Sequence, residues 1–332
     1  MRAFADFFAR FPTRRRIKEF PTFATLAAVV FRIVSNSLGS VFQKRLAARG
    51  RRPFFVNATT FFLLTLACVG PALSFDPTGF GPIFWRDVVV SGVLCAVGNA
   101  CLVAALGRGE LSILGPINAW KAVVGLIFAF FLLGEAPTFP ALFGVFLIGV
   151  GSYFVLDASP ERFSFRLLFQ NSAIRLRVAA LILTALEAIF IKKIVLAAGP
   201  TTAFFLWSAT GAVFSTLSLG VAAFLSAISP RFVSSTQSVQ ASQISQPPQV
   251  SRFSLRDALE LVATALCVGG MQLSTNFVFE RLDVGLALAL FQLSALLNVL
   301  LGWRLFRERG IVKKLFGATI IVLGASCVVL FG

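Results

Sequence analysis

Two similar stretches decide the fold: FFLLGEAPTFPALFGVFLIGVGS at residues 130–152 and WRLFRERGIVKKLFGATIIVLGAS at residues 303–326. Each stretch ends one apolar run near a glutamate, crosses a few polar residues and begins a second, glycine-rich apolar run. Three pairs of residues keep the same separation of 173 positions: Glu135 and Glu308, Gly144 and Gly317, and Gly151 and Gly324. This constant separation indicates that the chain contains an internal repeat.

The composition indicates which solvent surrounds most of the chain. The 332 residues are 57% hydrophobic and only 13% charged, whereas soluble globular chains carry about 25% charged residues. Apolar runs of roughly 20 residues recur along the whole length, which is the pattern of transmembrane helices. The formal charge of +16 is concentrated in short Lys/Arg runs between apolar runs, as in loops that contact anionic lipid. The sequence therefore predicts an all-α, polytopic membrane protein whose basic residues contact lipid, with no nucleic-acid partner.

Further matches along the chain define two halves. SVFQKRLAARG (40–50) resembles AIFIKKIVLAAG (188–199), and RDVVVSGVLCAVG (86–98) resembles RDALELVATALCVGG (256–270). The separation grows from 148 to about 172 because a Ser/Gln-rich stretch at 229–255 interrupts the second half. We expect about ten transmembrane helices, arranged as two five-helix repeats. Because five is odd, the second repeat is inverted relative to the first, an architecture typical of secondary transporters.

The apolar runs also set the expected boundaries. The predicted helices are 22–46, 54–73, 86–106, 111–133, 138–156, 174–197, 201–228, 256–279, 284–304 and 312–331. The predicted domains are a basic amphipathic N-terminal tail at 1–21, a first repeat at 22–157, a connector at 158–173, and a second repeat at 174–332 that contains the Ser/Gln-rich loop at 229–255.

A span that ends in LLGEAP or RLFRERG and is followed by a glycine-rich span, duplicated in a ten-span chain, resembles the EamA-type transporters of the drug/metabolite transporter superfamily. The resemblance covers residues 23–331. It implies a carrier whose fourth and ninth spans, residues 111–133 and 284–304 here, line a central cavity. Such families carry amino acids, sugars, nucleotide precursors and drugs, so the resemblance does not specify a substrate.

Three ionised side chains fall near the middle of predicted spans: Arg32, Lys121 and Glu187. A charge at the bilayer centre costs about 2.5–3.5 kcal/mol on insertion scales. A lysine stem reaches roughly 6 Å, while the midplane lies about 15 Å from either interface. We therefore expect Lys121 to face a cavity, with a structural ion pair to Glu187 or a displaced span as alternatives. Glu187 is the candidate coupling residue, and proton coupling stays open.

Polar residues at helical spacing extend this predicted cavity. Arg32, Ser35 and Asn36 share one face of the first span, and that face cannot point at lipid. Similar polar stripes occur on spans three, four, eight and nine, although single amides also serve as hydrogen bonds between helices. The predicted substrate-binding and cavity residues are Lys121, Asn118, Arg32, Asn36, Ser35, Asn99, Gln272, Asn276 and Gln292.

The function predicted from these features is transport of a small polar metabolite by alternating access, either secondary-active or facilitative. Two midplane cations favour a substrate with an anionic group, such as an amino acid, an organic acid or a phosphorylated compound. The sequence contains no histidine, the commonest general base and metal ligand, so we expect no enzyme activity, catalytic residue, metal or cofactor. The alternatives are a membrane scaffold or receptor and an intramembrane lipid-modifying enzyme. The expected location is the cell (inner) membrane.

Overall fold

The computed structural model describes residues 23–73, 75–121, 123–124, 127, 138–157, 171–228, 253–282 and 284–331. Several predicted segments lie outside these residues: the tail at 1–21, most of the connector at 158–173, residues 229–252 of the Ser/Gln-rich loop, the end of the fourth span, and Glu135. Every regular element in the described ranges is a helix.

The first half, residues 23–157, begins with the long helix α2 (Phe23–Ala48). The helices that follow are α3 (Pro53–Ala67), α4 (Val69–Leu73), a 3₁₀ turn at Pro77–Gly79, α5 (Pro82–Leu106), α6 (Leu111–Ile117), a 3₁₀ turn at Asn118–Trp120, and α8 (Phe139–Asp157). Prolines begin α3 and α5 because the first helical position needs no backbone N–H donor.

The second half, residues 171–331, begins with α10 (Ser172–Ile228), which bends sharply at Gly199. Gly199 has φ 81° and ψ 164°, a conformation that glycine adopts readily, and Pro200 then begins the second arm. Two predicted spans, 174–197 and 201–228, are therefore the two arms of α10. The remaining helices are α12 (Leu255–Arg281), α13 (Val284–Phe291), α14 (Ser294–Phe306) and α15 (Ile311–Phe331).

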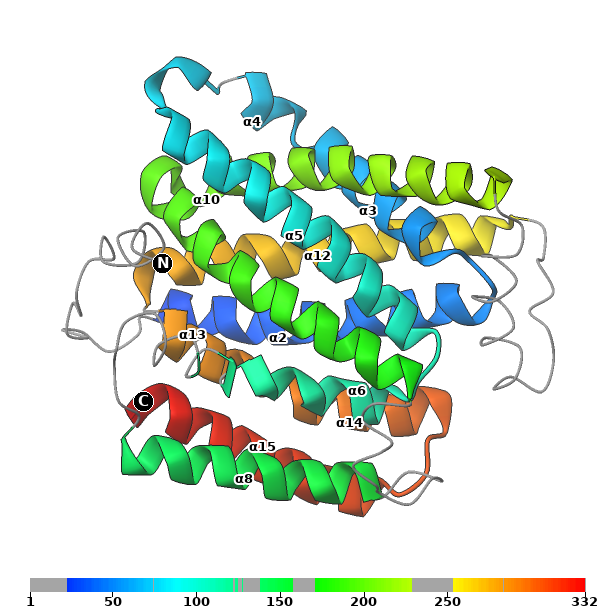
Figure 1. The fold of residues 1–332 in the computed structure, drawn as a ribbon, viewed down its shortest axis with the longest axis vertical. Coiled ribbons are helices and arrows are strands. Elements are labelled where there is room, and N and C mark those ends of the chain that lie inside the picture. Colours follow the sequence, from blue (N-terminus) through cyan, green and yellow to red (C-terminus); the bar gives the residue numbers. More distant parts are fainter. Residues whose placement is uncertain are drawn as a thin grey trace.

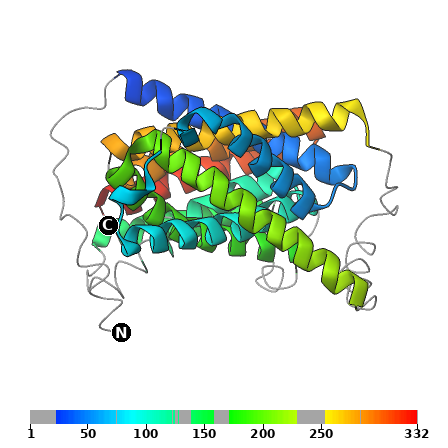
Figure 2. The same ribbon diagram turned by 90° about the horizontal axis from the view of Figure 1, so that it is seen from above.

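Four helices in the described ranges are long and apolar enough to cross a membrane: Phe23–Ala48, Pro82–Leu106, Leu255–Arg281 and Ile311–Val328. The protein is therefore an integral membrane protein that spans the bilayer several times. Figure 1 shows the helices arranged as one bundle, in which α8 and α15 lie side by side. The first arm of α10 packs along α5, and α12 packs along α2. Figure 2 shows the same bundle from above.

Helices α8 and α15 contact each other through glycine. A Cβ atom built on Gly144 would lie 2.6 Å from the carbonyl oxygen of Gly324, and one on Gly151 would lie 2.6 Å from that of Gly317. The converse approaches, from Gly324 to Gly144 and from Gly317 to Gly151, have the same distance. The two backbones therefore touch with no side chain between them, as in close helix pairs within membranes.

The helix predicted at 284–304 is distorted at its centre. Regular α13 ends at Phe291 and α14 begins at Ser294, but Leu293 between them keeps right-handed helical angles, φ −55° and ψ −23°. The backbone hydrogen bonds here join residues three positions apart, as in a 3₁₀ turn. The Ser294 hydroxyl donates to the Phe291 carbonyl oxygen at 2.8 Å, and side-chain bonds of this kind compete with the regular helical ladder. The distortion matters because a 3₁₀ stretch inside a helix often marks a functional hinge.

Candidate functional site

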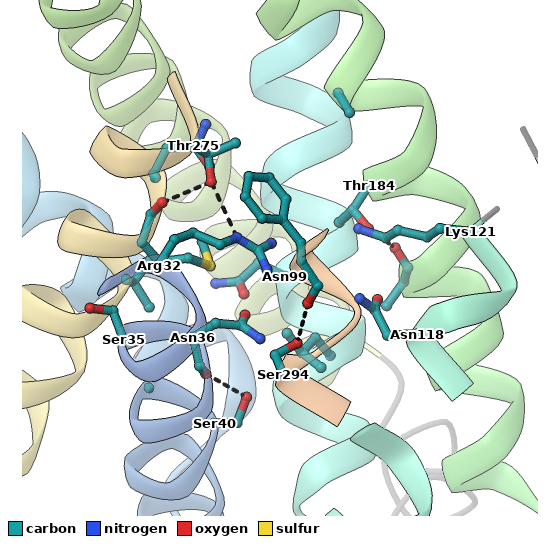
Figure 3. A pocket seen from close by; sticks show the side chains of 18 of the residues that line it. Arg32, Ser35, Asn36, Ser40, Asn99, Asn118, Lys121, Thr184, Thr275 and Ser294 are labelled. Carbon is teal, nitrogen blue, oxygen red and sulfur yellow. Dashed lines mark hydrogen bonds between the residues drawn. The ribbon is translucent and has the colours of Figure 1, made fainter. Parts of the chain in front are cut away.

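A cavity of about 140 Å³ lies between helices of the two halves. This volume is larger than a single water molecule needs. Its lining comes from α2, α5 and α6 of the first half and from α10, α12, α13 and α14 of the second half. Figure 3 shows labelled polar side chains that reach into it from several of these helices.

Most of the predicted site residues meet in this cavity. Those that line it are Arg32, Ser35, Asn36, Asn99, Asn118, Lys121, Gln272 and Glu187. Asn276 and Gln292 are buried but do not belong to the lining. Asn276 donates to the Pro200 carbonyl oxygen at 3.1 Å, and Gln292 donates to the Leu288 carbonyl oxygen at 3.1 Å. Asn276 therefore connects α12 to α10, which is the alternative use of amides inside membranes, whereas Gln292 bonds back to α13, four residues earlier.

Arg32 lies on α2 and is only 9% exposed. Its Nε donates to the Thr275 hydroxyl at 3.4 Å, and its guanidinium carbon lies 3.9 Å from the centre of the Phe291 ring. One of its terminal nitrogens is buried without a hydrogen-bond partner in the described residues. Since α2 crosses the bundle with Ser35, Asn36 and Arg32 on its inner face, this cation is held away from lipid.

Lys121 follows the 3₁₀ turn at Asn118–Trp120, where the regular helix α6 has already ended. Figure 3 shows its side chain extending toward Thr184 of α10. The described part of the chain gives its ammonium group neither a hydrogen bond nor an ion pair. Its electrostatic neighbours are Arg177, Arg32 and Glu187. Trp120, one residue earlier, points elsewhere, since its indole donates to Ser152 at 2.9 Å.

Glu187 lies on the first arm of α10 and is 8% exposed. Its carboxylate accepts a hydrogen bond of 2.7 Å from the indole nitrogen of Trp207, on the second arm of the same helix. The Phe61 ring packs against Trp207 at 4.9 Å between ring centres. The carboxylate is thus oriented by an aromatic donor that is itself fixed by packing.

The sequence interpretation missed several residues of the lining. Arg177 belongs to RLR at 175–177, one of the short basic runs for which lipid contact is predicted. Instead it lines the cavity, and its Nε donates to the Leu114 carbonyl oxygen at 2.9 Å. Its signal was available, because Arg177, Thr184 and Glu187 lie on one face of α10 at helical spacing. Thr275 of α12 was also missed, whereas Asn298 of α14 lies on the polar stripe predicted for span nine and is in the lining.

A second set of polar contacts lies one turn beyond the cavity, where α2 ends and α15 begins. We call it the Glu308 cluster, comprising Lys44, Glu110, Ser112, Glu308 and Lys314. Glu308 pairs with Lys44 at 2.7 Å and accepts from the backbone nitrogens of Leu111 and Ser112 at 2.8 and 2.9 Å. It also accepts from the Ser112 hydroxyl. Lys314 pairs with Glu110 and donates to the Ser112 hydroxyl at 2.9 Å.

The pKa of Glu308 reflects this environment. Burial alone would raise it, but the Lys44 charge and the hydrogen bonds from Lys44 and Ser112 outweigh burial and hold the pKa below its ordinary value of 4.5. Because Glu308 belongs to the second half and Lys44, Leu111 and Ser112 to the first, the carboxylate connects the two halves beside the cavity.

No group of three or more Cys, Asp and Glu side chains that could hold a metal is found in the described ranges. The arrangement instead offers cations, amides and hydroxyls around a small volume. Such groups bind an anionic or polar molecule by charge and hydrogen bonds.

Comparison with known proteins identifies part of the chain. Residues 23–157 match the EamA-like transporter family. No curated protein matches the chain. Among solved structures, 19 chains match. One of these, described only as "Crystal structure of protein", is 16% identical and aligns with a TM-score of 0.60 over 92% of this chain and 96% of its own. At that identity the likeness shows a shared fold alone.

Proposed function

Because residues 23–157 form an EamA-like transporter family domain, we propose that the chain carries a small polar metabolite with an anionic group across a membrane by alternating access. Transport of small molecules, not catalysis, is what membership in this family implies. The proposed location is the cell (inner) membrane. In this proposal Lys121 and Arg32 bind the anionic group, and the polar lining residues Ser35, Asn36 and Asn118 accommodate the rest of the molecule.

One observation carries the proposal: polar stripes from both halves of the chain converge on one cavity. Substrate sites of secondary transporters lie near the midplane between two repeats. Here the 3₁₀ turn that precedes Lys121 and the 3₁₀ distortion between α13 and α14 both border the cavity, and such stretches inside helices often mark functional hinges. A scaffold function does not require polar stripes to converge on one cavity, so the convergence favours transport over this alternative.

We propose further that the chain is a ten-helix inverted repeat. The glycine contacts support this, because a shift of 173 positions turns Gly144 into Gly317 and Gly151 into Gly324. The same shift therefore exchanges the contact between Gly144 and Gly324 with the contact between Gly317 and Gly151. Contacts that exchange in this way are the pattern of a two-fold axis. The pairing of α2 with α12 and of α5 with the first arm of α10 follows the same exchange.

Alternating access requires one end of the cavity to open while the other closes. The Glu308 cluster is proposed as the closed gate at its end, since it ties α2 and α6 of the first half to the second half beside Leu111, which lines the cavity. Glu187 is the proposed coupling residue. Its test is the pH dependence of uptake, which should flatten in Glu187→Gln if a proton on this carboxylate drives transport.

The alternative of an intramembrane enzyme has less support. It requires an acid and a base near one another, and among the described residues Glu187 is the only carboxylate in the cavity lining. The Glu187 carboxylate is hydrogen-bonded to the Trp207 indole, and the nucleophilic side chain beside it in the described lining is the buried Cys95. Transport therefore explains more of the lining than chemistry does.

The experiment has two stages. An untargeted comparison of metabolites in cells with and without the protein first selects candidate substrates. Uptake of those candidates is then measured in vesicles for the native protein, Lys121→Ala, and Lys313→Ala as a control that removes an exposed lysine. We expect Lys121→Ala to abolish most of the uptake, because it removes the ammonium group from the cavity, and Lys313→Ala to leave uptake unchanged. Equal uptake by Lys121→Ala and the native protein would remove Lys121 from the site.

A further inference from the structure

The charges that line the cavity do not balance. Arg32, Lys121 and Arg177 contribute three positive charges, and Glu187 contributes one negative charge. The described lining contains no other charged side chain, so two positive charges are in surplus. Arg32 and Arg177 are 9% and 8% exposed, which makes their desolvation costly unless a counter-ion is present.

Glu187 does not serve as the counter-ion of the whole set. Its carboxylate is turned toward the Trp207 indole at 2.7 Å. Within the described part of the chain it forms no ion pair with any of the three cations. Even complete neutralisation of Lys121 by Glu187 would leave both arginines uncompensated.

Arg32 lacks an acceptor that its geometry requires. A guanidinium carries five N–H donors, yet here Nε has a long hydrogen bond of 3.4 Å to Thr275 and one terminal nitrogen is buried without a partner. The Phe291 ring covers one face of the guanidinium. Its edge therefore remains for a group with two acceptor oxygens that take two parallel hydrogen bonds, as a carboxylate or a phosphate does.

Lys121 and Arg177 form the other wall of the same space. Figure 3 shows Arg32 and Lys121 extending toward the middle of the cavity from opposite sides. Among the described residues, Arg177 donates one hydrogen bond, to Leu114, so most of its donors are left for other acceptors. The carboxamide oxygen of Asn298, also in the lining, is buried with no partner in the same part of the chain and can accept from a hydroxyl.

We propose that the cavity binds a small organic anion with two negative charges, held between Arg32 on one wall and Lys121 with Arg177 on the other. This inference rests on the proposed function, since it names the class of the transported molecule. A dicarboxylate reaches both walls with separate groups, whereas a phosphate monoester concentrates both charges at one of them. Either ligand neutralises the surplus charge of the lining.

Binding to the detergent-purified, full-length protein tests this without requiring transport. A ligand that binds the folded state raises the thermal midpoint, and the shift grows with the logarithm of the ratio of ligand concentration to dissociation constant. The probes are succinate, its monomethyl ester, its dimethyl ester and glycerol 3-phosphate. We expect at least one of the two dianions to bind at least tenfold more tightly than the monoanion, and the neutral diester to give no shift. The comparison of succinate with glycerol 3-phosphate distinguishes the two sources of charge.

Variants separate a binding role from a structural one. Arg32→Gln lowers the surplus to one charge, so dianion affinity should fall at least tenfold while monoanion affinity falls less. Arg32→Lys keeps the charge but not the two parallel donors, so it should keep the preference for a dianion while binding it more weakly than the native protein does. Arg304→Gln, an exposed arginine of α14 outside this cavity, should bind like the native protein. If Arg32→Gln elutes as an aggregate, Lys121→Gln takes its place with the same expectation.

The outcomes distinguish the two proposals. If all probes give equal shifts or none, or if Arg32→Gln keeps the native preference for a dianion, the dianion inference is overturned even where vesicles transport another compound. If the charge preference and its loss are observed but vesicles show no flux of the preferred anion, binding stands and the proposed transport function fails.

Discussion

Replacing Gly144 by alanine should destabilise the protein, whereas the same change at Gly149 of the same helix should not. The added methyl group at Gly144 would lie 2.6 Å from the Gly324 carbonyl oxygen and 2.8 Å from the Val328 backbone nitrogen. Both neighbours are backbone atoms, so no side chain can move aside. To restore an ordinary contact of about 3.4 Å, the helices must separate by roughly 0.8 Å, and a gap of that size forfeits a quarter to a half of each dispersion contact.

The magnitude follows from these distances. Overpacking of this kind costs about 1–3 kcal/mol, while alanine in a helix interior recovers about 0.5–1 kcal/mol relative to glycine. The net loss for Gly144→Ala is therefore about 0–2.5 kcal/mol, and its difference from an unhindered Gly→Ala change is the overpacking cost itself, about 1–3 kcal/mol. Gly149 has no atom within 4 Å of its built Cβ, so Gly149→Ala should be neutral or slightly stabilising. At about 2–4 °C per kcal/mol for chains of this size class, the two midpoints should differ by several degrees.

The assay is the midpoint of thermal aggregation, followed by size-exclusion chromatography of heated, detergent-purified protein. Gly151→Ala should repeat the effect, because its Cβ also lies 2.6 Å from a carbonyl oxygen, that of Gly317. Equal midpoints for Gly144→Ala and Gly149→Ala, or a Gly144→Ala midpoint above that of the native protein, would refute the backbone contact between α8 and α15.

Three other predictions concern polar contacts. Glu308→Gln should weaken the closed end of the cavity by about 2–4 kcal/mol, because it removes one partner of a largely buried ion pair. A cysteine introduced beside Lys44 should then react faster with an impermeant thiol reagent. An unchanged rate would count against the gate. The pKa of Glu308 lies below its ordinary value of 4.5, so the stability that its ion pair contributes is complete above pH 4.5 and is lost as the pH falls through the lowered pKa. The thermal midpoint of the native protein should therefore fall in this acid range. The midpoint of Glu308→Gln should lack this part of the fall. Asn57→Leu should lower the free energy of unfolding by about 1–2 kcal/mol, because the Asn57 amide donates to the Ala96 carbonyl oxygen of α5 at 3.0 Å and to the Ser215 hydroxyl of α10 at 2.9 Å. A thermal midpoint equal to that of the native protein would contradict this prediction.

Helix positions follow closely from the sequence because lipid leaves few choices. Every backbone polar group in the bilayer must be paired within the protein, so an apolar run of sufficient length becomes a helix. The run predicted at 22–46 is α2, Phe23–Ala48, and the run predicted at 312–331 is α15, Ile311–Phe331. The 3₁₀ distortion at Gln292 and Leu293 could not be predicted in this way, since no proline or glycine marks it.

The cavity lining was harder to predict from the sequence, because a helix face turned away from lipid can face either the cavity or another packed part of the protein. Asn276 and Gln272 lie one turn apart on α12, and the same reasoning selected both. Gln272 lines the cavity, whereas Asn276 donates to the backbone at Pro200, beyond a bend that periodicity does not describe. Arg177 was missed for a related reason: near the start of a span a basic residue normally contacts lipid headgroups, but the end of α6 covers this one.

The cap of helix α6 has a consequence for the order in which the protein is made. The first backbone nitrogens of α6, at Leu111 and Ser112, are paired by Glu308, a residue synthesised nearly two hundred positions later. Glu110, just before this helix, forms an ion pair with Lys314, which is also synthesised much later. During synthesis the helix that leads to Lys121 therefore remains without its cap until the last two helices reach the membrane. A chain stopped after the first half should contain its helices but not a settled cavity, so the site is among the last parts of the protein to form.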